Sequence, residues 1–360
     1  MDDLTRNQHF VPQLLLRHFE TSDEEVQIFD STRNKIRTSS IRRVFSRNKF
    51  YDDDNAVEKF LAEKVEGPAA EAVNSIVASP NQAIEPGLPA LLTFIAVQMA
   101  RTPGTQTQAL DFVDGFSSMV FEQFAELNGH PIESVRNLKW RPTDERVMRN
   151  RLLLRSVLNR WLLEDLSWHV LSNSTDLPFV ISDHPAVPYN WYLRNSDDPS
   201  YTGMTKIGVQ IFLPLSPSVT LALIDKSIYK FGEKGSGHTV LHDKRDVDLL
   251  NSLQFRSRQD FIVFPLAMDA NYVKRSCVEI PASSLVRACA SRTDPVPTGD
   301  DKLSSSLCVW RTQARYEQWL SVCKIKRRVS KMAVECRDRR PETVAAQMAA
   351  ARDLFDRSTN

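Results

Sequence analysis

The sequence lacks any run of about 20 consecutive apolar residues, the length that a helix needs to cross a bilayer. It also lacks an excess of charge of one sign, since 46 lysines and arginines face 45 acidic residues and the formal net charge is +1. A chain so balanced has no overall field that attracts nucleic acid or an anionic membrane. The N-terminus lacks the basic and apolar regions of a secretory signal peptide. These absences predict a cytoplasmic protein that does not associate with a membrane.

Cysteine is scarce and confined to one part of the chain. The five cysteines lie between residues 277 and 336, their number is odd, and none is two or three residues from the next. This pattern favours reduced thiols over disulfides, and no metal site is predicted there. The sequence also lacks a nucleophile elbow, a Walker-type phosphate loop and a dinucleotide fingerprint. These patterns therefore name neither a cofactor nor a reaction class.

What is present is an ordinary globular composition, with 42% hydrophobic and 25% charged residues, enough for a sizeable core. Helical periodicity dominates the first half, and apolar runs typical of strands follow it. We therefore expect an α+β fold, mainly α-helical, with a helical N-terminal half followed by a small antiparallel β-sheet. The expected elements are a β-hairpin at 25–41, helices at about 55–78, 90–101, 107–127 and 143–166, and strands at 168–172, 178–182, 210–217 and 219–224.

One polar stretch, 291–301, holds two prolines and a glycine and is typical of a linker. We expect residues 1–290 before it to form a single globular α+β domain. Residues 302–360 after it are expected to form a helical C-terminal extension. That extension carries five basic residues within 324–331, which indicate a solvated helix face more often than a nucleic-acid contact.

The most unusual segment is the helix that ends at Arg101, because it is apolar almost all round and therefore belongs in a core. Thr93, Gln98 and Arg101 fall within one arc of roughly 140° on it. A buried polar stripe must find hydrogen-bonding partners. The acidic residues Glu58 and Glu66 of the preceding helix are natural partners for Arg101, unless they form a solvated edge.

Three further polar residues stand at the ends of expected elements or on a short helix. His9 precedes a helix, Asp183 ends the strand 178–182, and Asn251 lies on a helix that begins near residue 246. Such positions often carry functional side chains, but they are as often caps and turns. Each residue is therefore a candidate with a structural alternative.

These candidates belong to an ordered set of short patterns. The set comprises His9-x-x-Pro12, Phe50-Tyr51, the helix from Glu58 to Glu66, Gln98-x-x-Arg101-Thr-Pro, Ser182-Asp183-x-Pro185, Pro214-Leu-Ser-Pro217 and the helix with Asn251. In order and approximate spacing it resembles the uncharacterised domain of unknown function 4238 family over about residues 7–265. That family usually has a small or amide residue where this chain has His184, so the resemblance implies no role for that imidazole. It supplies no established activity either.

The first hypothesis for function is an enzyme, a hydrolase or a nuclease-like phosphodiesterase. The catalytic residues would be His9, Glu66 and Asp183, and the substrate-binding residues would be Gln98, Arg101 and Asn251. Arg101 would bind an anionic group such as phosphate or carboxylate. Asp183 or Glu66 would act as general base or metal ligand, and His9 would act as general acid.

The second hypothesis is a non-catalytic binding or interaction module, for instance in a stress or anti-phage response. The same polar residues would then form a structural network, with Arg101 paired to Glu66 or Asp183. The basic C-terminal run would serve as the interaction surface. The sequence alone does not decide between the two hypotheses, and it names no partner.

Overall fold

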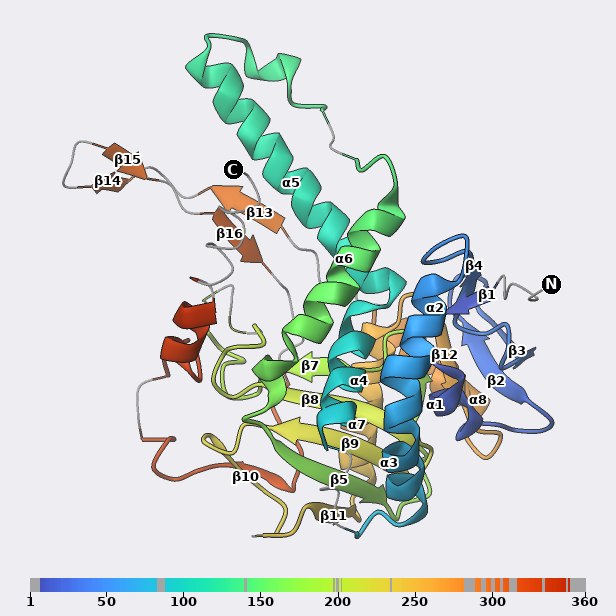
Figure 1. Ribbon diagram of the computed structural model, residues 1–360. Coiled ribbons are helices and arrows are strands. Elements are labelled where there is room, and N and C mark those ends of the chain that lie inside the picture. Colours follow the sequence, from blue (N-terminus) through green and yellow to red (C-terminus); the bar gives the residue numbers. More distant parts are fainter. Residues whose placement is uncertain are drawn as a thin grey trace.

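The computed structural model describes residues 7–82, 88–138, 141–196, 198, 201, 203–233, 235–281, 316–331, 334–347 and 349, and the backbone of four short strands between 289 and 310. In this part of the chain, two sheets of four and five strands organise the fold (Figure 1). No helix among the described residues combines the length and the apolar character needed to span a bilayer.

The larger sheet has the strand order β11-β5-β9-β8-β7 and forms a central layer. Its strands are β5 (Ser167–Asn173), β7 (Val187–Tyr189), β8 (Gln210–Ser216), β9 (Val219–Ile224) and β11 (His238–Leu241). Every residue of β8 and β9 is buried. Along β9, Val219, Leu221 and Leu223 join one core cluster, whereas Ala222 and Ile224 join a second, because successive side chains point to opposite faces of a strand. The sheet therefore separates two cores.

Helices cover both faces of this sheet, with α3 and α4 in front of it and α7 behind it in Figure 1. The helices before the sheet in sequence are α1 (Gln13–Arg17), α2 (Ala56–Leu61), η1 (Ala62–Glu66), α3 (Gly67–Ala78), α4 (Leu88–Ala100), α5 (Pro103–Leu127), η3 (Ile132–Ser134), α6 (Glu145–Leu158) and η4 (Arg160–Leu163). The helices that follow the sheet in sequence are α7 (Lys244–Ser257) and α8 (Ala270–Glu279). The helix α5 extends away from the sheets and leaves Phe124 and Leu127 more than half exposed.

The smaller sheet has the order β3-β2-β12-β6. Its strands are β2 (Glu25–Asp30), β3 (Lys35–Ser40), β6 (Ile181–Ser182) and β12 (Phe261–Phe264). The hairpin β2–β3 forms as the sequence predicts, and β2 then pairs with β12, with Phe29 opposite Ile262. A separate two-stranded ladder pairs β1 (Asn7–His9), which precedes β2 in sequence, with β4 (Ser46–Asn48), which follows β3. A sheet thus joins the first forty residues to a strand from the second half of the chain.

The expected arrangement, a mainly α-helical α+β chain with a helical N-terminal half followed by one small antiparallel sheet, is wrong. Strands occur from residue 7 onward, and β2 and β3 are part of a sheet completed near residue 264. The larger sheet is not purely antiparallel, because β11 runs parallel to β5. Periodicity along the chain detects a strand but carries no information about its partner, which is why the arrangement was missed.

The C-terminal residues that the structure describes contact the main body. The strand β17 (Cys323–Ile325) pairs with β10 (Tyr229–Phe231), and Trp319 is buried in the second core cluster. Backbone pairing joins β13 (Cys289–Arg292) to β16 (Leu307–Trp310) and β14 (Val296–Thr298) to β15 (Lys302–Ser304). The side chains of the expected linker 291–301 lie outside the described residues. The proposed boundaries of the domain and its extension stay predictions.

Candidate functional site

Arg101 follows α4 directly and is fully buried at the centre of a polar network. Its Nη1 donates to Oε1 of Glu66 at 2.7 Å, and its Nε donates to the Tyr51 hydroxyl at 3.2 Å. Its Nη2 donates to the carbonyl oxygen of His9, which also accepts from the Tyr51 hydroxyl at 3.0 Å. A buried guanidinium is stable only when its donors are satisfied, and three protein acceptors meet it here. Arg101 therefore joins β1, the β4–α2 connection and η1.

The π-helical segment η1 explains how two carboxylates reach this site. A π-turn adds one residue to an α-helix, so Glu58 and Glu66, eight residues apart, take the angular relation of an i, i+7 pair. That relation separates them by only about 20° around the axis, against about 80° in an unbroken α-helix. The widened turn lies just before Pro68, whose ring crowds the preceding turn and which has no N–H to donate. The helix therefore continues from α2 into α3 through a widened turn.

Glu58 and His9 are the titratable groups beside the buried arginine. Oε1 of Glu58 accepts from the backbone N–H of His9 at 3.2 Å and lies 4.0 Å from its Nδ1. Burial raises the pKa of Glu58 to about 7, although the charge of Arg101 lowers it. Burial also lowers the pKa of His9, whose Nε2 lies 3.1 Å from the carbonyl oxygen of Ile41. Since a carbonyl only accepts, Nε2 carries a proton and donates it to Ile41.

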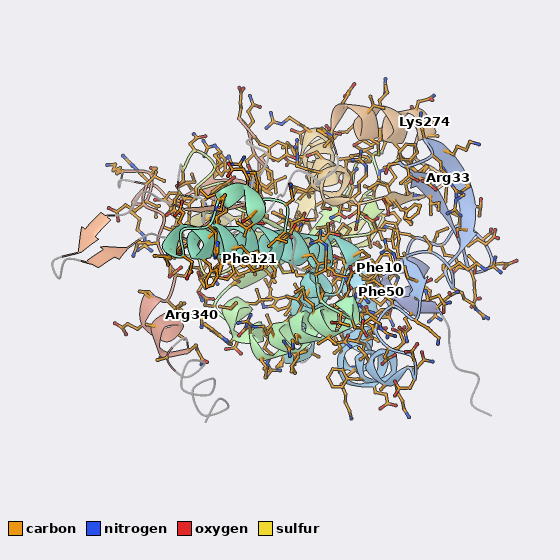
Figure 2. The ribbon with its side chains drawn as sticks, turned by 90° about the horizontal axis from the view of Figure 1, so that it is seen from above. Phe10, Arg33, Phe50, Phe121, Lys274 and Arg340 are labelled. Atoms are coloured by element: carbon orange, nitrogen blue, oxygen red, sulfur yellow. The ribbon has the colours of Figure 1, made fainter. Side chains whose placement is uncertain are left out.

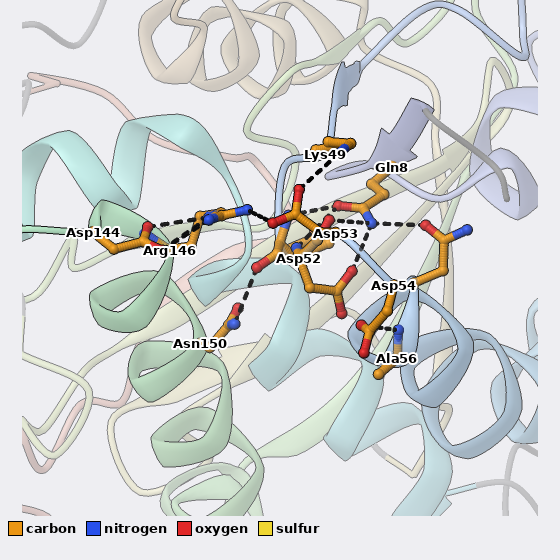
Figure 3. Close-up of polar contacts among 11 residues, drawn as sticks. Gln8, Lys49, Asp52, Asp53, Asp54, Ala56, Asp144, Arg146 and Asn150 are labelled. Atoms are coloured by element: carbon orange, nitrogen blue, oxygen red, sulfur yellow. Dashed lines mark hydrogen bonds and ion pairs between the residues drawn. The ribbon is translucent and has the colours of Figure 1, made fainter.

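Two glutamines extend the network. The side-chain Nε2 of Gln98 donates to the carbonyl oxygen of Phe10 at 3.0 Å, and that side chain is fully buried. Gln8, which the sequence does not single out, accepts from the N–H of Tyr51 at 2.6 Å and donates to Oδ1 of Asp52 at 2.7 Å. Figure 3 shows Gln8 and Asp52 at the centre of these contacts, with Arg146 reaching across from α6. The residues of β1 and Phe10 after it are therefore held by side chains from α2, from α4 and from the connection between β4 and α2.

Asp183 and Asn251 bind backbone groups and not Arg101. The carboxylate of Asp183, at the end of β6, accepts from the N–H groups of Gln259 and Asp260 at 2.7 Å each, and from a third N–H, that of residue 261, at 3.0 Å. Burial raises the pKa of Asp183 to about 6, although these three bonds lower it. Asn251 on α7 accepts from the N–H of Val180 at 3.0 Å. Thus His9, Glu66, Gln98 and Arg101 are brought together, whereas in the described part of the chain Asp183 and Asn251 form no hydrogen bond or ion pair with them.

A pocket of about 550 Å³ lies between the hairpin β2–β3, the turn that leads to β4 and the residues that enter β12. Its lining includes three arginines, Arg37, Arg43 and Arg47, and four hydroxyl residues from β3 and the turn. Glu25 on β2 also lines it, and so do the aspartates Asp183 and Asp260. Both aspartates have a pKa raised chiefly by burial, so they hold their charge less firmly than exposed aspartates. The pocket therefore combines three arginines, here called its basic wall, with three carboxyl groups, of which that of Asp183 is buried and that of Asp260 is half-buried.

The three arginines of this wall differ in the side chains that they contact. The guanidinium of Arg47 lies 5.9 Å from the ring centre of Phe10 and 6.0 Å from that of Phe50, and it forms only a 4.0 Å pair with Asp260. Within the described residues, the side chains of Arg37 and Arg43 form no ion pair. An unpaired arginine at a pocket can bind phosphate or carboxylate with two parallel hydrogen bonds. The sequence did contain a signal for this wall, because residues 31–51 hold seven basic and no acidic residues.

No group of three or more histidine, cysteine or acidic side chains in the described part of the chain is placed to hold a metal ion. The three described cysteines, at 277, 323 and 336, are free thiols, and burial raises the pKa of the first two. Buried thiols with a raised pKa are poor nucleophiles, because the thiolate is the reactive form.

The chain matches one family model, described as "Protein of unknown function (DUF4238)", over residues 7–265. The matched region includes the Arg101 network, the pocket and Asn251. Neither the search of curated proteins nor the search of solved structures returned a match.

Proposed function

The chain belongs to the DUF4238 family, whose function is unknown, and we propose that it binds an anionic ligand in the pocket lined by Arg37, Arg43 and Arg47. The observation that carries this proposal is the presence of two exposed, unpaired arginines in one wall of a pocket of about 550 Å³. A third arginine, held over two aromatic rings, completes the wall. Phosphate and carboxylate are the groups that such a wall would bind.

The Arg101 network supports this proposal because its arginine is buried and already paired. Arg101 has no exposed surface, and its donors already meet Glu66, Tyr51 and the His9 carbonyl oxygen. A ligand would have to displace these acceptors and open the core to reach it. The sequence suggests an anion site at Arg101, and we place that site at the pocket arginines instead. The Arg101 network then has a structural role and holds β1 in place. This proposal follows the binding-module hypothesis, in which Arg101 is structural, but places the binding surface at the pocket arginines rather than at the basic C-terminal run.

Binding of inorganic pyrophosphate, measured by isothermal titration calorimetry, tests the proposal. The test variant is the double substitution Arg37→Gln with Arg43→Gln, and the control is Arg327→Gln with Arg328→Gln, which removes equal charge from the C-terminal basic run. We expect the test variant to bind at least roughly tenfold more weakly, because each lost guanidinium removes charge-assisted hydrogen bonds. Equal binding by both double variants, or none by the wild type, would overturn the proposal.

A second candidate, hydrolysis of a phosphodiester, is favoured by one observation. Asp183 lines the same pocket and has a pKa of about 6, so it is partly protonated near neutral pH and could exchange a proton with a bound ester. Turnover of bis(4-nitrophenyl) phosphate by the wild type, lost in Asp183→Asn while pyrophosphate binding persists, would support it. Absence of turnover, or turnover unchanged in Asp183→Asn, would exclude this role.

A further inference from the structure

The pocket arginines belong to a longer basic segment, residues 33–49, which contains Arg33, Lys35, Arg37, Arg42, Arg43, Arg47 and Lys49 and no acidic residue. The chain as a whole has a net charge of only +1, so this segment concentrates charge that the rest of the molecule offsets elsewhere. All seven side chains are exposed. A neutral protein with one strongly basic segment carries a local rather than an overall positive field.

The fold arranges these cations along one path. The strand β3 is the outer strand of its sheet and pairs only with β2 among the described strands. Arg33 lies at the outer end of the hairpin (Figure 2), followed by Lys35 and Arg37 along β3. Residues two apart on a strand share a face and are separated by about 6.6–6.8 Å. Arg37 already lines the pocket, so the path runs from the hairpin end into the pocket without a break in charge.

Three of the seven cations form ion pairs, Arg47 with Asp260 among them, and Glu25 lines the pocket beside them. Arg42 pairs with Glu24 at 3.0 Å and Lys49 pairs with Asp53 at 2.9 Å, and both pairs are exposed. Exposed pairs contribute little and exchange readily for another anion. In the described part of the chain, Arg33, Lys35, Arg37 and Arg43 form no ion pair at all. The path therefore offers at least four cations to a ligand that carries several negative charges.

The aromatic residues near the pocket indicate how such a ligand would be recognised. Phe10, Phe45 and Phe50 are each at most 4% exposed, and they pack against one another and beneath Arg47. None of these three rings is free to stack on a base, and Phe261, which also lines the pocket, is half-buried beside Phe45. The contacts would therefore go chiefly to phosphates and would not read sequence. The hydroxyl groups of Thr38, Ser39, Ser40 and Ser46 in the pocket lining suit phosphate oxygens equally well.

We propose that the basic segment 33–49 binds single-stranded nucleic acid through its phosphates, with one phosphate in the pocket and the next ones along β3. This inference rests on the proposed anion site and extends it from one phosphate to a chain of them. Lys35 and Arg37, two residues apart on β3, present two positive charges about 6.6–6.8 Å apart, and Arg33 precedes them in the turn. A flexible single strand can follow the hairpin and place one phosphate in the pocket.

Fluorescence anisotropy of a labelled 20-nucleotide single strand of mixed sequence tests the proposal with the full chain. The key variant is Arg33→Gln with Lys35→Gln, which lies outside the pocket. Arg327→Gln with Arg328→Gln is again the control. Each phosphate contact adds about 0.7 to the salt dependence of log K for a single strand, so the key variant should flatten the slope by roughly 1.4. It should also weaken binding about tenfold at low salt, and the control should change neither.

The outcomes separate this inference from the proposed function. If the key variant binds the oligonucleotide as the wild type does, or if the control variant loses binding, the segment is not the nucleic-acid site. If pyrophosphate binding depends on Arg37 and Arg43 but no oligonucleotide binds, the pocket takes a small anion and only the nucleic-acid inference fails. Tighter binding of duplex than of single strand refutes the single-strand assignment. Circular dichroism and unchanged melting temperatures show that each variant is folded.

Discussion

Replacing Arg101 by alanine should destabilise the protein strongly, because the substitution breaks a buried ion pair from one side. It removes the donors to Glu66, to the Tyr51 hydroxyl and to the His9 carbonyl oxygen. Breaking such a pair typically costs about 3–5 kcal/mol. The Glu66 side chain is 23% exposed and regains some water, and Tyr51 keeps its bond to His9, so the lower half of that range applies best.

The assay is thermal unfolding followed by circular dichroism. An unfolding entropy of about 2.1 cal/mol/K per residue, applied to 360 residues, converts 3–5 kcal/mol into a fall of about 4–7 °C in melting temperature. Arg42→Ala is the matched control, since that arginine also pairs with a glutamate but is 71% exposed. Its melting temperature should stay close to that of the wild type.

One result would refute the reasoning. If Arg101→Ala melts within about 1 °C of Arg42→Ala, the guanidinium is not needed for folding, and a role in ligand binding becomes the better explanation. A second variant sharpens the test. Arg101→Met combined with Glu66→Leu replaces both partners by apolar groups and should be less destabilised than Arg101→Ala, because no unpaired charge is left buried.

Three further predictions concern the same framework. Glu58→Gln should gain stability relative to the wild type as pH rises from about 4.5 to about 7, by up to roughly 3 kcal/mol in urea unfolding. The Glu58 carboxyl has a pKa of about 7 in the folded protein and about 4.5 in the unfolded chain. The folded state therefore loses stability as the pH rises from about 4.5 to about 7, because the unfolded carboxyl ionises more easily than the buried one, and the glutamine variant escapes this loss. A constant difference across that range would contradict the buried position of Glu58. Deleting Glu63 should restore an unbroken α-helix without moving Glu58, so the melting temperature should stay unchanged or rise. Deleting Glu71 in α3 should instead rotate the following residues by about 100° and lower the melting temperature clearly. Similar losses in both variants would show that the π-turn is not a one-residue insertion. Asp183→Ala should cost about 3 kcal/mol in urea unfolding, since three backbone N–H groups lose their acceptor, whereas the exposed Asp176→Ala should have little effect, and equal effects would rule out this structural role.

Much of the local structure could be predicted from the sequence. The apolar helix that ends at Arg101 and the hairpin β2–β3 form where periodicity places them. The polar stripe of that helix also finds acceptors, since Gln98 donates to the Phe10 carbonyl oxygen and Thr93 donates to that of Pro89 at 3.0 Å. These features depend on contacts between near neighbours and on the rule that buried polar groups are paired.

Other features needed the tertiary structure. Nothing in the sequence around Asp183 shows that its carboxylate binds the backbone of residues 259–261, because that contact forms only when β6 pairs with β12. The approach of Glu58 to Arg101 likewise depends on one widened turn, which neither residue's spacing reveals. The basic residues between 33 and 49 were visible as a charge run, but only the pairing of β3 and the turn after it bring three of them to one pocket.

The sequence by itself determined the apolar helix that ends near Arg101 and the hairpin β2–β3, that Arg101 must be buried with a partner, and which family the chain belongs to. Those properties follow from the chemistry of residues close together in the chain and from ordered motifs. The tertiary structure decided which strands share a sheet and which arginines face a common space. It also decided that Arg101 lies in the framework rather than at an open site. Contacts between residues far apart in the chain decide these matters, because hydrophobic burial and strand pairing select partners that no local pattern encodes.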